Sequence, residues 1–444
     1  VYALVAPFPT VLDGVSLEEL EQAWKGKSPP DLEGGILRMT AETRAVFTAL
    51  WGKPAASGVQ TVAADQLLET SCAHQPAWAL VPFEDLSPRW KVLQVEHHSP
   101  LESGEIAAAY PLVVGFGLVP VKTGSAMTAA EPLQALATNR DPAKMTTLVM
   151  TGTTALVRNT ALRMEEEGID YPALDIGNWL RSADLTHISN EVPFYTQCPP
   201  AEPLRREMRF CSDPSYIGLL QAVGANIIEL TGNHVLDWGT DAFLYTLDLY
   251  RQNQMPYYGG GENLADARKP LLVEHNGNRL AFIGCNPMGP ANILATDDRP
   301  GAASCDLDWM TEQVQSLLQE GYLPIVTFQH FEIDTYQPQS GQRHDFQRMA
   351  EAGAVIVSGS QAHFPQAMTF EGDRFVHYGL GNLFFDQMSK GNRRTFIDRH
   401  IFYDGRYIST ELLTAVLEDY ARPRPMTSDE REAFLSDVFA ASEW

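Results

Sequence analysis

Short apolar runs alternate with amphipathic segments from the beginning of the chain. Two segments between the first runs, residues 16–26 and 40–52, place apolar side chains at helical spacing between a Ser or Thr cap and a glycine. The apolar runs themselves predict strands at residues 1–8, 77–83 and 110–119. Strands that alternate with helices predict an α/β unit over residues 1–140.

A second domain is expected over residues 145–444, where the same alternation continues. Amphipathic segments at residues 242–253 and 307–320 predict helices. Apolar runs rich in β-branched residues predict strands at residues 145–152, 225–232, 279–285, 323–330, 354–360 and 374–382. The predicted fold class is therefore α/β, and the second domain is expected to be a layered sandwich whose polar strand ends gather at one rim.

The charge balance excludes one class of partner. The chain has 444 residues, with 56 acidic and 32 basic side chains and a formal net charge of −24. Such a surplus repels a phosphate backbone, so no nucleic-acid partner is expected. An anionic substrate would need a local basic cluster or a metal ion, and the arginines from Arg393 onward are expected to pair with the surplus acids. No apolar run is long enough to predict a membrane-spanning segment.

Four of the five cysteines are spaced in pairs. Cys198 and Cys211 enclose a proline-rich loop, and Cys285 and Cys305 enclose another, which leaves Cys72 over. Two loop-closing disulfides are typical of an oxidising compartment, and the alternative is a set of reduced, buried cysteines in a cytosolic protein. We expect a secreted or cell-surface, extracytoplasmic protein, although no signal peptide begins at Val1.

Potential ligands follow five of the predicted strands. Asn233, His234 and Asp237 lie on one short turn, and this combination suits a divalent cation or an acid/base site. Any one such segment is equally typical of a helix cap or a loop, but five of them at strand ends of one domain predict a functional rim. The other four segments contribute residues 152–154, Asn190 and Glu191, Gln329 with His330 and Glu332, and Gln361 with His363.

Three motifs of the second domain form a recognisable set. They are N-H-x-x-D-x-G at residues 233–239, Y-Y-G-G-G-E-N-L-A-D-A-R-K-P at 257–270 and Y-G-L-G-N-L-F-F-D at 378–386. Residues 145–387 resemble the CapA family, named for poly-γ-glutamate capsule synthesis, and this implies a sandwich of the calcineurin-like metallophosphatase type followed by an arginine-rich extension. The first domain resembles a lobe of the periplasmic phosphate-type substrate-binding proteins, through S-L-E-E-L-E-Q-A-W-K-G, A-L-V-P-F-E-D-L and S-P-L-E-S-G.

The chain departs from the CapA family at expected metal ligands. Thr153 stands where members usually carry an aspartate, and Gln361 stands where they usually carry a histidine. A two-metal phosphoesterase site needs a bridging carboxylate and several imidazoles, so the resemblance implies at most one divalent metal ion in this chain. The ligands that remain for it are Glu191, Asn233, His234 and His363.

The same residues suit a hydrolase. We expect the catalytic residues to be the carboxylates of Glu191, Asp237 and Glu332 and the imidazoles of His234, His330 and His363. Candidate substrate-binding residues are Asn190, Asn233, Trp238, Gln329, Gln361 and Asn382.

Three functions are compatible with this set of residues. The first is a secreted CapA-like hydrolase of an extracellular polymer, either a polysaccharide cleaved by a carboxylate pair or poly-γ-glutamate. The second is a non-catalytic protein that binds or assembles capsule or exopolymer and has a decayed metal site. The third is a single-metal phosphoesterase.

Overall fold

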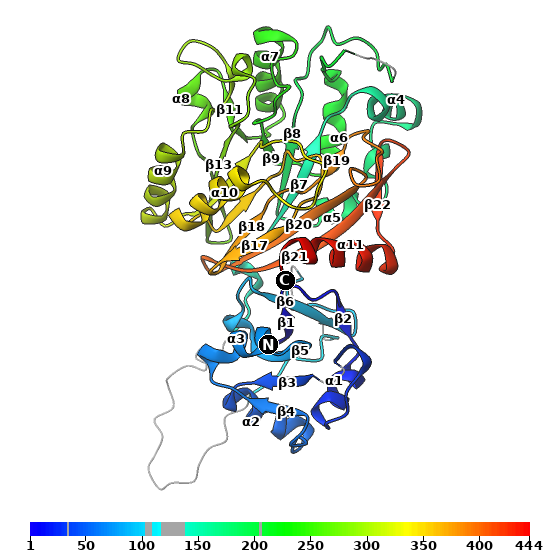
Figure 1. The fold of residues 1–444 in the computed structure, drawn as a ribbon, viewed down its shortest axis with the longest axis vertical. Helices are drawn as coiled ribbons and strands as arrows, with labels where there is room; N and C mark the ends of the chain where they lie inside the picture. The colour runs from blue at the N-terminus through cyan, green and yellow to red at the C-terminus, as the bar shows by residue number, and fades with distance from the viewer. Residues whose placement is uncertain (33–34, 103–108, 117–137, 204–206) are drawn as a thin grey trace, which may run out of the picture. The chain divides into compact units, whose positions relative to one another are not determined.

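The computed structural model of the chain describes residues 1–32, 35–102, 109–116, 138–203 and 207–444 (Figure 1). Contacts between these residues divide the chain into two units, Val1–Met145 and Thr146–Trp444. Each unit has its own sheets and its own buried apolar cluster.

The first unit is built on a six-stranded sheet with the order β2-β6-β1-β5-β3-β4. Its first helix begins as the sequence predicts, with a capping box in which the Ser16 and Glu19 side chains each bond the other residue's backbone N–H. The strands are β1 (Tyr2–Pro7), β2 (Gly14–Val15), β3 (Ile36–Met39), β4 (Val59–Thr61), β5 (Ala77–Pro82) and β6 (Trp90–Val95). The helices are α1 (Leu17–Trp24), α2 (Ala41–Trp51) and α3 (Leu67–Ala73).

The strand expected over residues 110–119 does not form in its described part, residues 110–116. The neighbouring strand β1 already pairs with β5 on one edge and with β6 on the other. The apolar run therefore contributes to the core instead of the sheet: Tyr110 and Leu112 are buried, and the Tyr110 hydroxyl donates to the backbone oxygen of Tyr2 at 2.9 Å. Residues 117–119 of this run lie outside the described residues.

The second unit contains two large sheets. The eight-stranded sheet has the order β10-β9-β8-β7-β20-β21-β22, with β19 also paired to β7. Its strands are β7 (Met145–Thr154), β8 (Leu185–Asn190), β9 (Ile227–Glu229), β10 (Tyr257–Tyr258), β19 (Asn382–Phe384), β20 (Arg394–Tyr403), β21 (Arg406–Glu418) and β22 (Arg422–Pro425). The six-stranded sheet has the order β12-β13-β15-β16-β18-β17. Its strands are β12 (Leu271–His275), β13 (Asn278–Cys285), β15 (Leu323–Phe328), β16 (Ile356–Ser358), β17 (Met368–Glu371) and β18 (Arg374–His377), and a separate pair is formed by β11 (Gly260–Gly261) and β14 (Gly301–Ala302).

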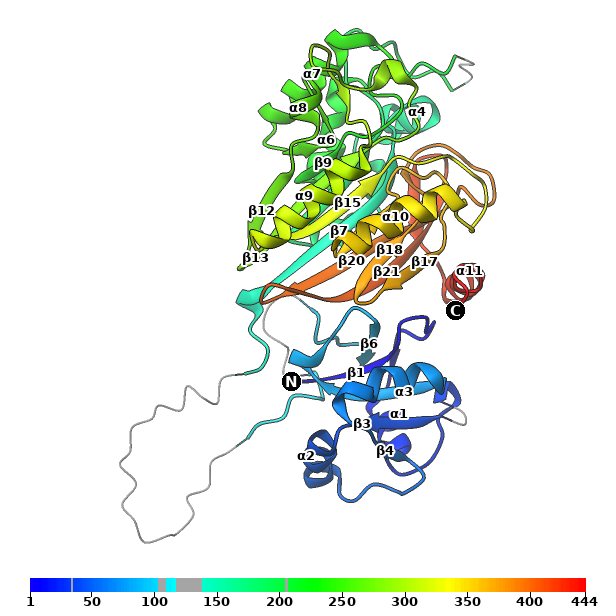
Figure 2. The same cartoon turned by 60° about the vertical axis from the view of Figure 1, so that its left-hand side comes forward.

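The two large sheets face each other and carry helices on their outer sides (Figures 1 and 2). Across the sheet-to-sheet layer, the ring of His187 on β8 stacks on Phe282 of β13, and His377 on β18 bonds Asp398 of β20 at 2.6 Å. The helices are α4 (Arg158–Glu167), α5 (Gly177–Arg181), α6 (Ile217–Ala222), α7 (Gly239–Gln252), α8 (Leu264–Ala267), α9 (Leu307–Gln319), α10 (Ser340–Ala352) and α11 (Ser428–Ala441). The predicted α/β class and layered sandwich are confirmed.

The arginine-rich segment after residue 393 completes the eight-stranded sheet as β20, β21 and β22. Its arginines form ion pairs with acids, as expected from the charge surplus. These pairs are Arg394–Asp437, Arg399–Glu411, Arg422–Asp175 and Arg424 with Glu418 and Glu430.

The two disulfides expected from the cysteine spacing are present. They join Cys198 to Cys211 and Cys285 to Cys305, while Cys72 is free. Within the part of the chain that the structure describes, no helix is both long and apolar enough to cross a membrane.

Candidate active site

The carboxyl ends of strands from both large sheets supply the candidate site. The eight-stranded sheet contributes Glu191 after β8 and Asn233 after β9, and the six-stranded sheet contributes the loops after β15 and β16. Gly232 allows the loop after β9 to approach β8, because a Cβ atom there would lie 2.7 Å from the Cα atom of Glu191. The predicted rim therefore forms where two sheets meet.

Two carboxylates and one imidazole meet in the middle of this rim. His363 Nε2 lies 3.4 Å from Glu191 Oε1 and 3.2 Å from Glu332 Oε1. Ligand atoms of these three residues all lie within 4.8 Å of one another. Burial disfavours the protonated ring of His363, but the two carboxylates outweigh this effect and raise the pKa of His363 well above its usual value. Burial likewise acts against the charge of Glu332, yet His363 lowers the pKa of Glu332.

Asn382 fixes the orientation of His363. His363 Nδ1 donates to Asn382 Oδ1 at 2.7 Å, and Asn382 Nδ2 donates back to the His363 backbone oxygen at 3.2 Å. This pair of bonds leaves Nε2 to face the carboxylates. Asn382, which the sequence predicts to bind substrate, thus lies behind the imidazole and orients it.

A second acid/base pair stands beside this cluster. The turn after β9 closes with the Asp237 N–H donating to the His234 backbone oxygen at 3.1 Å, which puts the two side chains on one side. His234 Nδ1 then bonds Asp237 Oδ2 at 2.7 Å. Burial opposes protonation of His234, but the hydrogen bond to Asp237 and the charges of Glu191 and Glu332 raise the pKa of His234.

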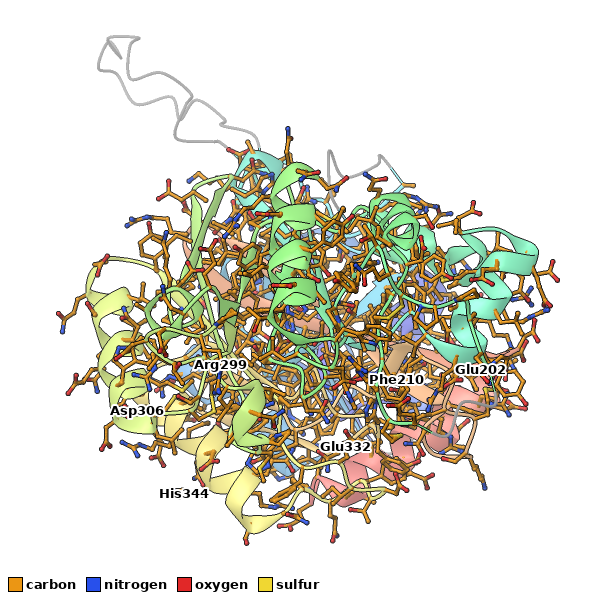
Figure 3. The ribbon with its side chains drawn as sticks, turned by 90° about the horizontal axis from the view of Figure 1, so that it is seen from above. Glu202, Phe210, Arg299, Asp306, Glu332 and His344 are labelled. Carbon is orange, nitrogen blue, oxygen red and sulfur yellow. A yellow bond between two sulfur atoms is a disulfide. The ribbon has the colours of Figure 1, made fainter. Side chains whose placement is uncertain are left out.

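Two residues that the sequence does not single out hold this His–Asp dyad. The Phe210 N–H donates to Asp237 Oδ2 at 2.8 Å, and the Phe210 ring packs against the His234 ring with centroids 4.9 Å apart. Arg209 Nε donates to the Asp237 backbone oxygen at 2.8 Å, and its guanidinium lies over the Trp238 ring. The signal in the sequence is the neighbouring Cys211, whose disulfide anchors this segment. Phe210 and Glu332 both lie on the face seen in Figure 3.

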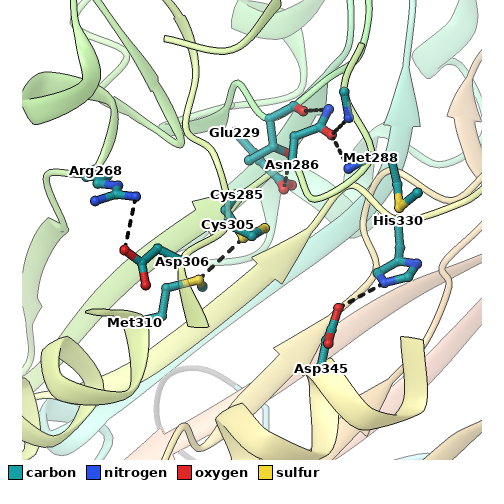
Figure 4. The surroundings of a disulfide bond; sticks show 12 residues. Glu229, Arg268, Cys285, Asn286, Met288, Cys305, Asp306, Met310, His330 and Asp345 are labelled. Atoms are coloured by element: carbon teal, nitrogen blue, oxygen red, sulfur yellow. Dashed lines mark hydrogen bonds and ion pairs between the residues drawn. A yellow bond between two sulfur atoms is a disulfide. The ribbon is translucent and has the colours of Figure 1, made fainter. Parts of the chain in front are cut away.

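His330, which the sequence predicts to be catalytic, points away from the cluster. Its Nε2 lies 3.2 Å from Asp345 Oδ2 on α10 (Figure 4). The ring of His330 packs against Phe331 and Phe346. Burial lowers the pKa of His330 despite the nearby Asp345. His330 therefore belongs to the packing between β15 and α10.

Several side chains that the sequence predicts to bind substrate carry buried polar atoms that have no hydrogen-bond partner among the described residues. Asn233 Nδ2 reaches Glu332 Oε1 at 3.5 Å, but its Oδ1 has no partner. Asn190 Nδ2 donates to the Val192 backbone oxygen at 2.7 Å. Among the described residues, the atoms without a partner are Asn233 Oδ1, Trp238 Nε1, Gln329 Oε1 and both amide atoms of Gln361. Buried polar groups are normally paired, so a group of unpaired ones at one rim points to a ligand or ion.

The donor set fits one divalent cation. Glu191 and Glu332 offer two carboxylates, and His363 offers an imidazole once a cation displaces the proton on Nε2, a mixture that suits ions such as Mn²⁺ or Zn²⁺. Asn233 Oδ1 is a buried acceptor with no hydrogen-bond partner in the described chain, and buried Glu191 Oε1 faces His363 Nε2 at 3.4 Å. The cluster thus shares Glu191 and His363 with the ligand set expected from the sequence and adds Glu332, whereas His234 pairs with Asp237.

The fold and this site define the class of protein: a two-sheet α/β sandwich with carboxylate, imidazole and amide side chains at the strand ends. The family described as "Bacterial capsule synthesis protein PGA_cap" matches residues 147–387, which is more than half of the chain. The chain belongs to this family, and the family resemblance inferred from the three motifs is confirmed.

Known proteins with similar sequences carry capsule-related names. The capsule biosynthesis protein CapA of Bacillus anthracis is 24% identical over 64% of this chain and 70% of its own length. The PGA biosynthesis protein CapA of Bacillus subtilis (strain 168) is 22% identical over 50% of this chain and 59% of its own length. A probable polyglutamine synthesis accessory protein of Mycobacterium tuberculosis is 25% identical over 43% of this chain and 53% of its own length. The chain thus spans little more than half of the second and third of these relatives.

Solved structures with a similar arrangement include two nucleotidases. The 5′-nucleotidase precursor of Thermus thermophilus is 15% identical, with a TM-score of 0.37 over 67% of this chain and 59% of that chain. A putative 5′-nucleotidase of Staphylococcus aureus is 12% identical, with a TM-score of 0.39 over 66% of this chain and 58% of that chain.

Proposed function

We propose that this chain is an extracytoplasmic hydrolase that cleaves amide bonds in a poly-γ-glutamate-type capsule polymer with the help of one divalent cation. The observation that carries the proposal is the cluster of Glu191, Glu332 and His363 beside the His234–Asp237 dyad. A cation-binding group next to an imidazole supplies a Lewis acid and a proton donor, which together can promote hydrolysis of a carbonyl compound. The two disulfides support a place in an oxidising compartment.

Two observations support this choice of polymer: the family to which the chain belongs, and the positive charge of Arg209 beside the dyad. Membership of the capsule synthesis family and the names of the Bacillus relatives favour a capsule polymer. Arg209 is exposed next to the dyad, which gives a polymer carboxylate an attractive charge in a chain whose net charge is −24. This arrangement favours an anionic chain linked by amide bonds.

His234 is the proposed general acid. A bound cation would act as a Lewis acid on the scissile carbonyl. Water adds to the carbonyl carbon and gives a proton to the Glu332 carboxylate. The C–N bond breaks as the departing amine takes a proton from His234 Nε2, and the proton on Glu332 returns to His234 through solvent. Asp237 favours the protonated ring through its bond to Nδ1 and raises the pKa of His234, which suits His234 to the role of proton donor. Asn233 and Gln361 supply unpaired amide atoms that can bond the polymer backbone.

Cleavage of a polysaccharide by a carboxylate pair is less well supported. Ligand oxygens of Glu191 and Glu332 lie within 4.8 Å of each other, which is close to the roughly 5 Å of retaining glycosidases. Such enzymes need one carboxyl group that stays protonated. Both carboxylates face His363, and the pKa of Glu332 is lowered. An amide substrate with His234 as the acid avoids this difficulty.

The test is release of new amines from purified poly-γ-glutamate by the metal-free chain, with and without added Mn²⁺. We expect cleavage that depends on Mn²⁺, and we expect Glu191→Gln and His363→Asn to abolish it. Glu411→Gln is the matched control, because it removes a carboxylate that pairs with Arg399 on β20, away from the rim.

The other outcomes distinguish the remaining functions. Tight binding of the polymer without release of amines would favour the non-catalytic assembly protein. Release of phosphate from a model phosphoester by the wild type, but not by Glu191→Gln, would favour the single-metal phosphoesterase. Full activity of both site variants would refute the assignment.

A further inference from the structure

A fully buried carboxylate lies where the two sheets meet beneath the rim. Glu229 ends β9, and none of its surface is exposed. A buried carboxylate is costly unless hydrogen bonds and an opposite charge compensate for the lost water. The partners of Glu229 therefore indicate why the position carries a charge.

Each oxygen of Glu229 accepts a hydrogen bond from a different site loop. Thr231 Oγ1 donates to Oε1 at 2.8 Å, and Thr231 stands two residues before Asn233. Ser360 Oγ donates to Oε2, and Ser360 stands three residues before His363. The first loop leaves the eight-stranded sheet and the second leaves the six-stranded sheet. One carboxylate thus bridges the two halves of the site.

The neighbours of Glu229 reach the other two strands that lead to the site. His187 on β8 places its Nε2 atom 3.4 Å from Glu229 Oε2, and β8 leads directly to Glu191. The Tyr258 hydroxyl lies 2.8 Å from the same His187 nitrogen and 3.0 Å from Thr327 Oγ1 on β15. Burial acts against the charge of Glu229, but His187 and the hydroxyl donors outweigh it and lower the pKa of Glu229.

The loop after β9 is also held from its other side. Asn286 Nδ2 donates to the Thr231 backbone oxygen at 2.9 Å, and Asn286 follows Cys285 of the second disulfide. Figure 4 shows Glu229 and Asn286 close to this disulfide. Thr231 is therefore fixed through both its side chain and its backbone.

We propose that Glu229 is a positioning residue that holds the loop carrying Asn233 and His234 in register with the loop carrying His363. The inference builds on the proposed function, because it takes these two loops as the halves of one active site. Partners behind metal ligands and catalytic groups commonly affect metal affinity or activity about 10- to 100-fold. Glu229 has this effect on the site from a position between the two sheets.

The test compares Glu229→Gln with Asp398→Asn in the full chain. Asp398 is a matched control, since it is also buried and paired with a histidine, His377, but accepts no hydrogen bond from either site loop among its described contacts. We expect Glu229→Gln to lose hydrogen-exchange protection in residues 230–238 and 359–366 and to bind Mn²⁺ about 10- to 100-fold more weakly. Asp398→Asn should lower overall stability and leave both measurements unchanged.

Single-hydroxyl variants keep the test decisive if Glu229→Gln fails to fold. Ser360→Ala should reduce hydrogen-exchange protection in residues 359–366, and Thr231→Val should reduce it in residues 230–238. Unchanged exchange in both segments would overturn the inference. A wild type that binds no Mn²⁺ would instead overturn the proposed function, while the exchange data would still decide the role of Glu229.

Discussion

Removal of the Cys198–Cys211 disulfide should weaken both the fold and the His–Asp dyad. The two cysteines are 13 residues apart. Loss of such a cross-link increases the chain entropy of the unfolded state, and the corresponding loss of stability is about 3 kcal/mol. The double variant Cys198→Ser/Cys211→Ser should lose about this much free energy of unfolding.

The effect on the dyad follows from the residues next to Cys211. Phe210 donates its N–H to the Asp237 carboxylate, and Arg209 bonds the Asp237 backbone oxygen. A hydrogen bond to a charged group contributes about 1.5–3 kcal/mol. When the segment is released, Asp237 should hold His234 less firmly, so the pKa of His234 should fall and kcat should decrease about 10-fold or more.

Cys285→Ser/Cys305→Ser is the matched control for this experiment. These cysteines are 20 residues apart, so the entropic cost is nearly the same, also about 3 kcal/mol. Their loop gives Asp237 none of the hydrogen bonds that it receives from described residues. Urea unfolding gives the stabilities, and an NMR titration gives the pKa of His234. Equal pKa values of His234 in the two double variants would refute the reasoning.

Three further predictions concern single positions. Asp237→Asn should lower the pKa of His234 and reduce kcat about 100-fold with little change in KM, and an unchanged kcat would exclude His234 as the acid. Burial lowers the pKa of His400 from 6.5 to about 4, so neutral His400 stabilises the fold fully above pH 6.5. This contribution, about 3 kcal/mol, should be lost as the pH falls towards 4, and urea unfolding of His400→Gln should lack this part of the pH dependence. Gln361→Met should raise the free energy of unfolding by about 1–3 kcal/mol, because it removes a buried amide that has no hydrogen-bond partner among the described residues, and it should raise KM for the polymer. A loss of stability would contradict the assignment of Gln361 to substrate binding.

Local patterns in the sequence predicted much of the fold. The capping box of Ser16 and Glu19 and the apolar runs that became β9, β13, β15 and β16 depend on residues close together in the chain. The disulfide pairs also followed from spacing. The strand expected at residues 110–119 does not form in its described part. The apolar character of a run does not show whether the neighbouring strand has an edge free for pairing.

The candidate site was less accessible from the sequence, for a related reason. Motif positions predicted Glu191 and His363 at one rim, and their side chains lie 3.4 Å apart. The direction of His330 depends on Asp345, which lies on the following helix. Glu229 gave no signal, because a lone acid at the end of an apolar run is typical of a solvent-facing strand position. Its partner Ser360 is 131 residues away and lies on the other sheet.

The position of β20 in the sheet determines how far this domain can be truncated. The family match ends at residue 387, yet β20, β21 and β22 lie beyond it, and β20 is the neighbour of β7 inside the eight-stranded sheet. A chain shortened to the matched region would keep β19 paired with Thr153 and Thr154 but would leave the rest of that edge of β7 open, and the residues of β7 are buried throughout. Exposed apolar edges pair with other chains, so such a fragment should aggregate. A truncated form of the domain that stays in solution should therefore retain the hairpin of β20 and β21.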